Sequence, residues 1–169
     1  MWHGRLSSIA PSHHCAKGFT LIELLLTLAL LATLATVAYP LTALMGKRDR
    51  EVELQRSLRE IRRAIDSYKE ATDTGRIEKS VTASGYPPTL QALVEGVTDK
   101  TDLNGKKLYF LRRIPRDPVC ECPELAPQKT WQLRSYKSDP DHPSEGEDVF
   151  DVSSRSQRES LNGTPYSQW

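Results

Sequence analysis

The sequence predicts an α+β fold, in which a long N-terminal hydrophobic helix packs on a small C-terminal antiparallel β-sheet domain. Three observations support this prediction: residues 24–44 contain no charged side chain, a helical apolar stripe follows them, and short alternating runs between turn residues fill the rest. The 123 residues from Lys47 to Trp169 are enough for one small core but not for two domains.

The overall charge gives no sign of a nucleic-acid-binding surface. The 169 residues carry a formal net charge of +1, and the 27% of charged residues mix both signs along the chain. We therefore expect no nucleic-acid partner. The three cysteines, Cys15, Cys120 and Cys122, are too few for the disulfide framework of a small secreted domain.

A membrane-spanning segment is predicted from Leu24 to Leu44. At about 1.5 Å per helical residue, its 21 residues cover roughly the ~30 Å hydrocarbon core of a bilayer. Glu23 lies at the entrance of this segment, and a carboxylate costs about 2.5 to 3.5 kcal/mol at the bilayer centre and less near the interface. Because such a residue is usually retained with a partner, we expect a cation near Glu23.

The charges that flank the apolar segment leave its orientation open. Arg5 and Lys17 precede it without any acidic residue, which favours a cytoplasmic N-terminus. The stretch GKRDR, Gly46 to Arg50, carries an excess of positive charge on the other side and favours the opposite orientation. A secretory signal peptide cleaved after Ala38 is an alternative interpretation of the same segment.

The stretch KGFTLIE, Lys17 to Glu23, resembles the processing site of type IV prepilins and of the pseudopilins of type II secretion systems. The resemblance implies that a membrane-embedded prepilin peptidase cuts between Gly18 and Phe19 and that the new Phe19 amine is methylated. A glycine suits an extended, unhindered backbone just before a helix begins. The apolar helix then stays in the mature chain, because the cut precedes it.

The resemblance also implies a division of the chain and a location. We expect a single-pass protein of the bacterial inner membrane with its C-terminal domain in the periplasm. Its expected parts are a cleaved leader (1–18), a transmembrane helix that forms the filament core (19–45), a continuation of the amphipathic helix (46–75) and a globular α+β domain (76–169). Together these parts describe a pilin-like fold.

Cleavage would provide the cation that Glu23 needs. The Phe19 amine would lie four residues before Glu23, and each charge would lower the desolvation cost of the other. The resemblance implies that Glu23 neutralises the amine of a neighbouring subunit and so sets the register of assembly. An ion pair within one chain fits the spacing equally well, and a Glu23 side chain that reaches back to water is the simplest alternative.

Pro40 predicts a kink in the apolar helix. Proline cannot donate a hydrogen bond to the Thr36 carbonyl, and its ring crowds that turn. A proline that the helix merely tolerates is the alternative.

An amphipathic helix is predicted to continue beyond the apolar segment and to end at Gly75. Apolar residues recur at spacings of three and four and predict a core-facing stripe of Leu54, Leu58, Ile61, Ile65 and Tyr68. The other face is charged, and we expect it to be solvated or, in a filament, to meet neighbouring subunits. Its members are Glu53, Arg56, Arg59, Glu60, Arg62, Arg63 and Asp66.

Two later stretches resemble the G-type pseudopilin of type II secretion. The first, YPPTLQALVE from Tyr86 to Glu95, predicts a short helix that ends in Leu-Val-Glu, and the second is LYFLRRIPRDP. We expect a strand to enter at Leu108–Ile114 and a turn at Pro115–Pro118. The runs WQLRSYKS and DVFDVSS predict two antiparallel strands near the end of the chain.

The C-terminal segment departs from the G-type pattern. That family carries an acidic, glycine-rich loop after its last strand that binds calcium, but the only acid in residues 155–169 is Glu159. Calcium requires six to eight oxygen ligands, so no cofactor is expected at this place. An earlier stretch, residues 138–151, offers an alternative calcium site formed by Asp139, Asp141, Glu145, Glu147 and Asp148.

The remaining chemical candidates are Cys120, Cys122 and His142. The two cysteines fit free thiols, a link between chains or a strained disulfide, and with His142 they offer three zinc ligands at a spacing typical of no known zinc site. Incidental loop residues are the simpler interpretation. No nucleophile and base lie at a recognisable spacing, so we expect no catalytic site and no enzyme activity.

The sequence therefore favours a pseudopilin subunit of a type II secretion system. Such a subunit joins other pseudopilins on an inner-membrane assembly platform and forms a periplasmic filament that drives protein secretion across the outer membrane. Two alternatives stay open: a minor type IV pilin for adhesion, motility or DNA uptake, and a signal-anchored periplasmic enzyme.

Overall fold

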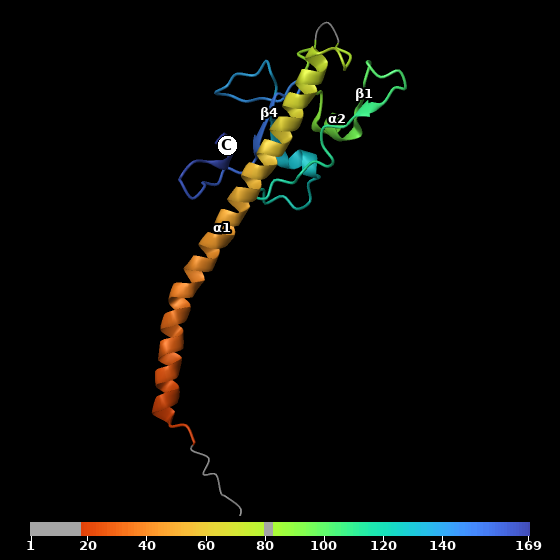
Figure 1. Cartoon of the computed structure of the whole chain (residues 1–169). Helices are drawn as coiled ribbons and strands as arrows, with labels where there is room; N and C mark the ends of the chain where they lie inside the picture. Colours follow the sequence, from red (N-terminus) through yellow and green to blue (C-terminus); the bar gives the residue numbers. More distant parts are fainter. Residues whose placement is uncertain (1–17, 80–82) are drawn as a thin grey trace, which may run out of the picture. The chain divides into compact units, whose positions relative to one another are not determined.

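The fold consists of one long helix followed by short elements. The computed structural model describes residues 18–79 and 83–169, without the side chains of residues 37–41 and 43. Its helices are α1 (Leu21–Asp73), α2 (Leu90–Glu95) and the 3-10 turns η1 (Pro127–Thr130) and η2 (Tyr166–Gln168); its strands are β1 (Val97–Thr98), β2 (Lys107–Leu108), β3 (Trp131–Arg134) and β4 (Asp151–Ser154) (Figure 1). An α+β fold with a long N-terminal helix and antiparallel sheets is thus confirmed.

The chain divides into two compact units, Met1–Thr42 and Ala43–Trp169. The boundary falls inside α1, so the first unit contains the apolar part of this helix and the second contains its amphipathic part. We call the second one the globular unit. In the described part of the chain, no helix combines the length and apolar character that a bilayer crossing requires. The membrane segment predicted at Leu24 to Leu44 includes the undescribed side chains of residues 37–41 and 43 and stays a prediction.

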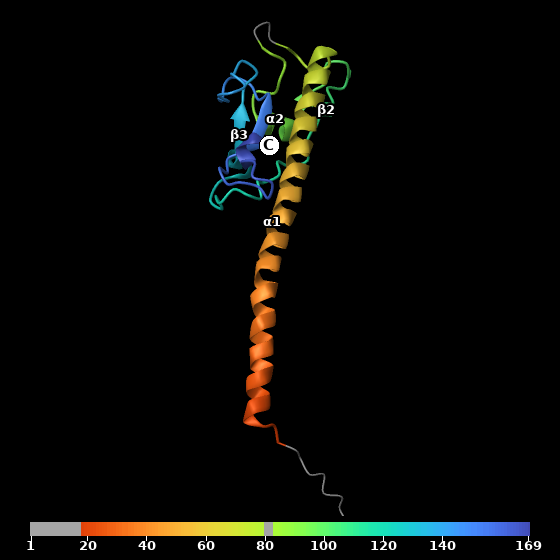
Figure 2. The same cartoon turned by 90° about the vertical axis from the view of Figure 1, so that its left-hand side faces the viewer.

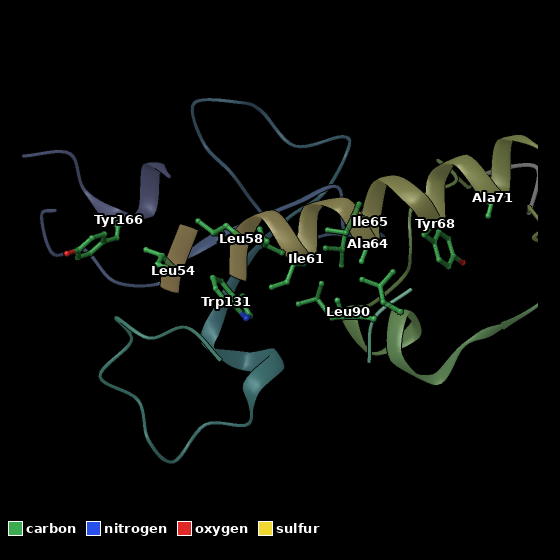
Figure 3. Packing of buried hydrophobic residues seen from close by; sticks show 14 of the residues in the cluster. Leu54, Leu58, Ile61, Ala64, Ile65, Tyr68, Ala71, Leu90, Trp131 and Tyr166 are labelled. Carbon is green, nitrogen blue, oxygen red and sulfur yellow. The ribbon is translucent and has the colours of Figure 1, made fainter. Parts of the chain in front are cut away.

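The core of the globular unit forms on one face of α1. Leu54, Leu58, Ile61, Ile65 and Tyr68 are all at most 8% exposed, which confirms the predicted stripe. Figure 3 shows these side chains in a row that meets Leu90 of α2, Trp131 of β3 and Tyr166 of η2. Figures 1 and 2 both show α2 and the β3–β4 sheet beside this part of α1. A single helix face therefore organises the whole globular unit.

Helix α1 ends where the sequence predicts. Its last residue is Asp73, and Gly75 has a φ of 76°, a conformation that glycine adopts without steric cost. The Gly75 amide donates to the Thr72 carbonyl at 3.1 Å, and the Arg76 amide donates to the Ala71 carbonyl at 2.9 Å. This pair of bonds is the Schellman motif, which satisfies carbonyls at a helix end.

The strands form two separate sheets rather than one. Strands β3 and β4 pair antiparallel, with Trp131 opposite Ser154 and Leu133 opposite Val152, as the two late alternating runs predict. The strand expected at Leu108–Ile114 is limited to Lys107–Leu108, which pair with β1. The amides of Phe110 and Leu111 both donate to the Leu93 carbonyl at 3.0 Å, so this stretch bonds to the end of α2 instead of extending a sheet.

Candidate functional site

The predicted cleavage site lies in exposed, non-helical chain. Gly18, Phe19 and Thr20 precede α1 and are all exposed, with Phe19 80% accessible. A Cβ atom added to Gly18 would meet nothing within 4 Å. The surroundings of Gly18 in the described part of the chain therefore do not require a glycine.

The helix start contains a cap that the sequence reasoning missed. The Glu23 amide donates to the Thr20 hydroxyl at 3.3 Å, and the Leu24 amide donates to the Thr20 carbonyl at 3.2 Å. Thr20 is therefore the N-cap of α1, and Glu23 lies three residues later in the first turn. The Thr-x-x-Glu spacing before an apolar run was the available signal. A carboxylate in the first turn is also stabilised by the positive end of the helix dipole.

The apolar part of α1 is exposed on all sides. Its large side chains from Leu21 to Leu34 are between 54% and 79% accessible in the described part of the chain. The polar groups among them are satisfied internally, because the Thr27 hydroxyl donates to the Leu24 carbonyl at 2.9 Å and the Thr33 hydroxyl donates to the Leu30 carbonyl at 2.8 Å. A helix whose polar side chains are hydrogen-bonded internally is suited to an environment without water. The Pro40 side chain lies outside those described, so the predicted kink stays a prediction.

The C-terminal segment is fastened to α1 by Arg62, which the sequence placed on the solvated face. Its guanidinium donates to the Asp151 carboxylate at 2.7 Å, to the Val152 carbonyl at 3.0 Å and to the Trp169 carbonyl at 2.7 Å. The expectation of a freely solvated Arg62 was wrong, because two acceptors from β4 and the Trp169 carbonyl just after η2 converge on one guanidinium.

A second fastening joins Glu51 of α1 to the same segment. The Glu51 carboxylate accepts hydrogen bonds from the Leu161 amide at 2.7 Å and from the Tyr166 hydroxyl at 2.9 Å. Burial and the hydrogen bond to Glu51 raise the pKa of Tyr166 to about 12. With Glu159 as its only acid, this segment does not have the carboxylates that a calcium site requires.

The acidic stretch around residues 138–151 does not gather its carboxylates. Asp148 points inward and accepts hydrogen bonds from Ser84, from the Ser135 hydroxyl at 2.7 Å and from the Tyr136 amide at 2.9 Å. Burial opposes its ionisation, but these hydrogen bonds outweigh burial and lower the pKa of Asp148. Across residues 18–79 and 83–169, no three His, Cys, Asp or Glu side chains converge as metal ligands.

Cys120 and Cys122 form a disulfide, with 5.3 Å between their Cα atoms. The interpretation of these residues as incidental loop cysteines was therefore wrong. Arg116 braces the same loop, because its guanidinium donates to the Leu125 carbonyl at 2.8 Å and to the Cys122 carbonyl. The zinc interpretation with His142 finds no support among the described residues, since the two sulfur atoms bond to each other.

Asp117 is a second residue that the sequence reasoning did not assign. It is 1% exposed, and its carboxylate accepts hydrogen bonds from the Val119 amide at 2.9 Å and from the Ser154 hydroxyl at 2.6 Å. It thereby joins the predicted turn at Pro115–Pro118 to β4. An acidic residue directly before a proline in a turn was the available signal.

Comparison with known proteins gives two matches. The family described as the prokaryotic N-terminal methylation motif matches residues 13–39. The type II secretion system core protein G of Pectobacterium carotovorum subsp. carotovorum is 30% identical over 119 residues, which cover 66% of this chain and 67% of that protein. No solved structure matches the chain. With its methylation motif at the start of an exposed apolar helix, the chain belongs to the family of type II secretion system core protein G, a family of pseudopilins.

Proposed function

We propose that this pseudopilin is cut between Gly18 and Phe19 by a prepilin peptidase and methylated at the Phe19 amine. The observation that carries the proposal is the methylation motif, whose match includes both residues and the whole first turn of α1. The exposed, non-helical backbone at Gly18 supports access by a peptidase. The open space around Gly18 supports a requirement set by the peptidase and not by the fold.

The mature chain then acts as a subunit of a pilin-like filament. The Leu24 to Leu44 segment holds it in the inner membrane, and the globular unit stands in the periplasm. An assembly platform extracts the subunits and joins them with other pseudopilins into a filament that drives secretion across the outer membrane. The apolar surface of α1 supports this role, because side chains more than half exposed in one chain are buried once helices pack together.

In this proposal Glu23 aligns each subunit as it enters the filament. Its position in the first turn, four residues after Phe19, supports a pairing with the amine that cleavage would create. The amine and the carboxylate then neutralise each other in an environment of low dielectric. The Thr20 hydroxyl accepts the hydrogen bond of the Glu23 amide, so this cap does not use the Glu23 carboxylate, which the proposal assigns to a neighbouring subunit.

The mass of the N-terminal peptide tests the proposed processing. We expect a chain that begins at methylated Phe19 in cells with the prepilin peptidase and an intact leader in cells without it. Gly18→Ala should keep the leader while the globular unit unfolds at the wild-type temperature, because the added methyl group meets no neighbour. A chain cut after Ala38 would contradict the proposal.

The role of Glu23 is tested by Glu23→Ala and Glu23→Gln in a secreting host. Both variants should be processed and inserted normally but should fail to assemble and secrete, since glutamine keeps the shape and lacks the charge. Normal secretion by Glu23→Gln would remove the charge from the mechanism. Normal secretion by Glu23→Ala would remove the residue from it altogether.

A further inference from the structure

A groove rich in arginine runs beside α1 in the globular unit. Two adjoining depressions of about 650 Å³ each share Arg56 and Glu60 and are walled by α1 and by residues 110–116. We call them together the arginine groove. Its lining contains six arginines and two glutamates: Arg56, Arg59, Arg63, Arg112, Arg113, Arg116, Glu53 and Glu60.

Five of these arginines have no partner in the described part of the chain. Arg116 bonds to two carbonyls, but Arg56, Arg59, Arg63, Arg112 and Arg113 are exposed and make no hydrogen bond or ion pair there. Guanidinium groups stay charged at any physiological pH and suit carboxylate partners. Even with Glu53 and Glu60 in the same lining, these five arginines leave an excess of three positive charges, so an anionic occupant would stabilise this surface.

A second copy of this chain offers such an occupant. The segment from Asp139 to Glu147, which we call the acidic segment, presents Asp139, Asp141, Glu145 and Glu147 to solvent. Two of these acids pair only loosely within the chain, because Glu145 lies 3.5 Å from Arg155 and Glu147 lies 3.9 Å from Lys137, all with exposed side chains. Exposed pairs of this kind contribute little and are readily exchanged.

The acidic segment has a defined shape. The Ser135 amide donates to the Ser144 carbonyl at 3.0 Å, and the Ser144 amide donates to the Ser138 hydroxyl at 2.8 Å. Asp148 fixes the end of the segment through Ser135 and Tyr136. A segment that is already ordered loses less conformational entropy when it binds.

The acidic segment and the arginine groove are separate surfaces of one copy. The acidic segment borders one depression beside Tyr68 and Thr72 and a second one beside Arg62, whereas the arginine groove is lined by α1 between Val52 and Ser67 and by residues 110–116. No residue of the acidic segment lines the groove. The acidic segment that meets the groove therefore has to come from a second copy.

We propose that the arginine groove of one copy binds the acidic segment of the next copy. The two surfaces are different, so each copy uses both, and such a head-to-tail contact can be repeated from copy to copy along a filament. The inference rests on the proposed filament function and adds to it the contact between the globular units. Complementary charges of this kind specify partner and register.

Cross-linking of the full chain in cells with a working secretion system tests this contact. Ser67→Cys lies in the groove wall and Pro143→Cys lies in the acidic segment, and neither substitution removes a charge. We expect differently tagged copies with these two cysteines to form a disulfide-linked pair. Ser67→Cys paired with Asn104→Cys, at the exposed β1–β2 turn, is the matched control and should form none.

Charge exchange completes the test. Arg59→Glu with Arg63→Glu in the Ser67→Cys copy should lower the cross-linked fraction about tenfold. Asp141→Arg with Glu147→Arg in the Pro143→Cys copy should restore it, and equal thermal unfolding of all variants should show that they fold. A cross-linked fraction that these substitutions do not change would overturn the contact and leave the proposed function intact. The absence of the cross-link from normal filaments would do the same. Wild-type cells without filaments would overturn both.

Discussion

The two parts of helix α1 expose their apolar side chains to very different extents. From Leu21 to Leu34 the large apolar side chains are more than half exposed, whereas the apolar stripe from Leu54 to Tyr68 is at most 8% exposed. The second part finds its partners within the chain, in α2, β3 and η2. The first part has no such partners among the described residues. The amphipathic half of α1 therefore stabilises the monomer, and its apolar half is available for contact with lipid or with other subunits.

Truncation of one apolar residue in each part should separate these roles most clearly. Ile61→Ala removes a side chain that is 0% exposed, and it should lower the free energy of unfolding of the globular unit by about 2 to 5 kcal/mol. Leu31→Ala removes one that is 62% exposed and should change it by less than about 0.5 kcal/mol. Urea unfolding of the full chain in detergent, followed by tryptophan fluorescence, measures both values.

Equal losses in the two variants would show that the apolar part of α1 also folds against its own chain. Impaired filament assembly in Leu31→Ala with normal unfolding would sharpen the comparison. It would show that this half of the helix contributes to assembly and not to the fold of the monomer.

A smaller effect is expected where Arg62 fastens the C-terminal segment. Arg62→Met removes three hydrogen bonds from a charged donor, and it should destabilise the globular unit by about 1 to 3 kcal/mol. Arg59→Met is the matched control on the same helix, because Arg59 has no partner in the described chain and should change stability little. Both are measured by thermal unfolding of the full chain.

The same measurement tests calcium. Because residues 155–169 contain one acid and protein side chains fasten this segment, added calcium or a chelator should leave the wild-type midpoint unchanged. An unfolding midpoint that rises with calcium would show a site that this donor set does not explain.

A loss of stability in Arg59→Met as large as that in Arg62→Met would contradict the role of Arg62.

The difference between the two arginines also shows what a sequence can predict. The stripe from Leu54 to Tyr68 was predictable because burial on one helix face imposes a period of 3.6 residues. The same periodicity places Arg59 and Arg62 together on the charged face. Only the fold of residues 151–169, far along the chain, decides that Arg62 receives three acceptors and Arg59 none.

The candidate site shows the same difference between local and long-range information. Gly18, Phe19 and Glu23 could be singled out because a short motif specifies recognition by another molecule, and that information is local. The Thr20 cap was equally local and could have been predicted from its spacing to Glu23. The Asp117 contact with Ser154 and the arginine groove depend on segments brought together by folding, so no local pattern predicts them.

The smallest expected effect concerns the chain just beyond the end of α1 and is confined to acid pH. Asp99 accepts hydrogen bonds from the Thr101 hydroxyl at 2.6 Å and from the Arg76 guanidinium at 2.6 Å, and these lower its pKa from 3.8 to about 2. A lowered pKa in the folded state gives stability that is present above pH 3.8 and is lost as the pH falls to about 2.

The difference in unfolding temperature between wild type and Asp99→Asn should therefore be constant from pH 7 to pH 4 and should narrow toward pH 2. Asp66→Asn, at an exposed position on α1, is the control for the general effect of replacing a carboxylate by an amide. A difference that stays constant down to pH 2 would mean that Asp99 titrates normally and that Arg76 does not fix the β1–β2 hairpin. A difference that narrows toward pH 2 would show that contacts within the globular unit continue beyond the last turn of α1. The apolar part of the helix has no comparable contacts within the described chain.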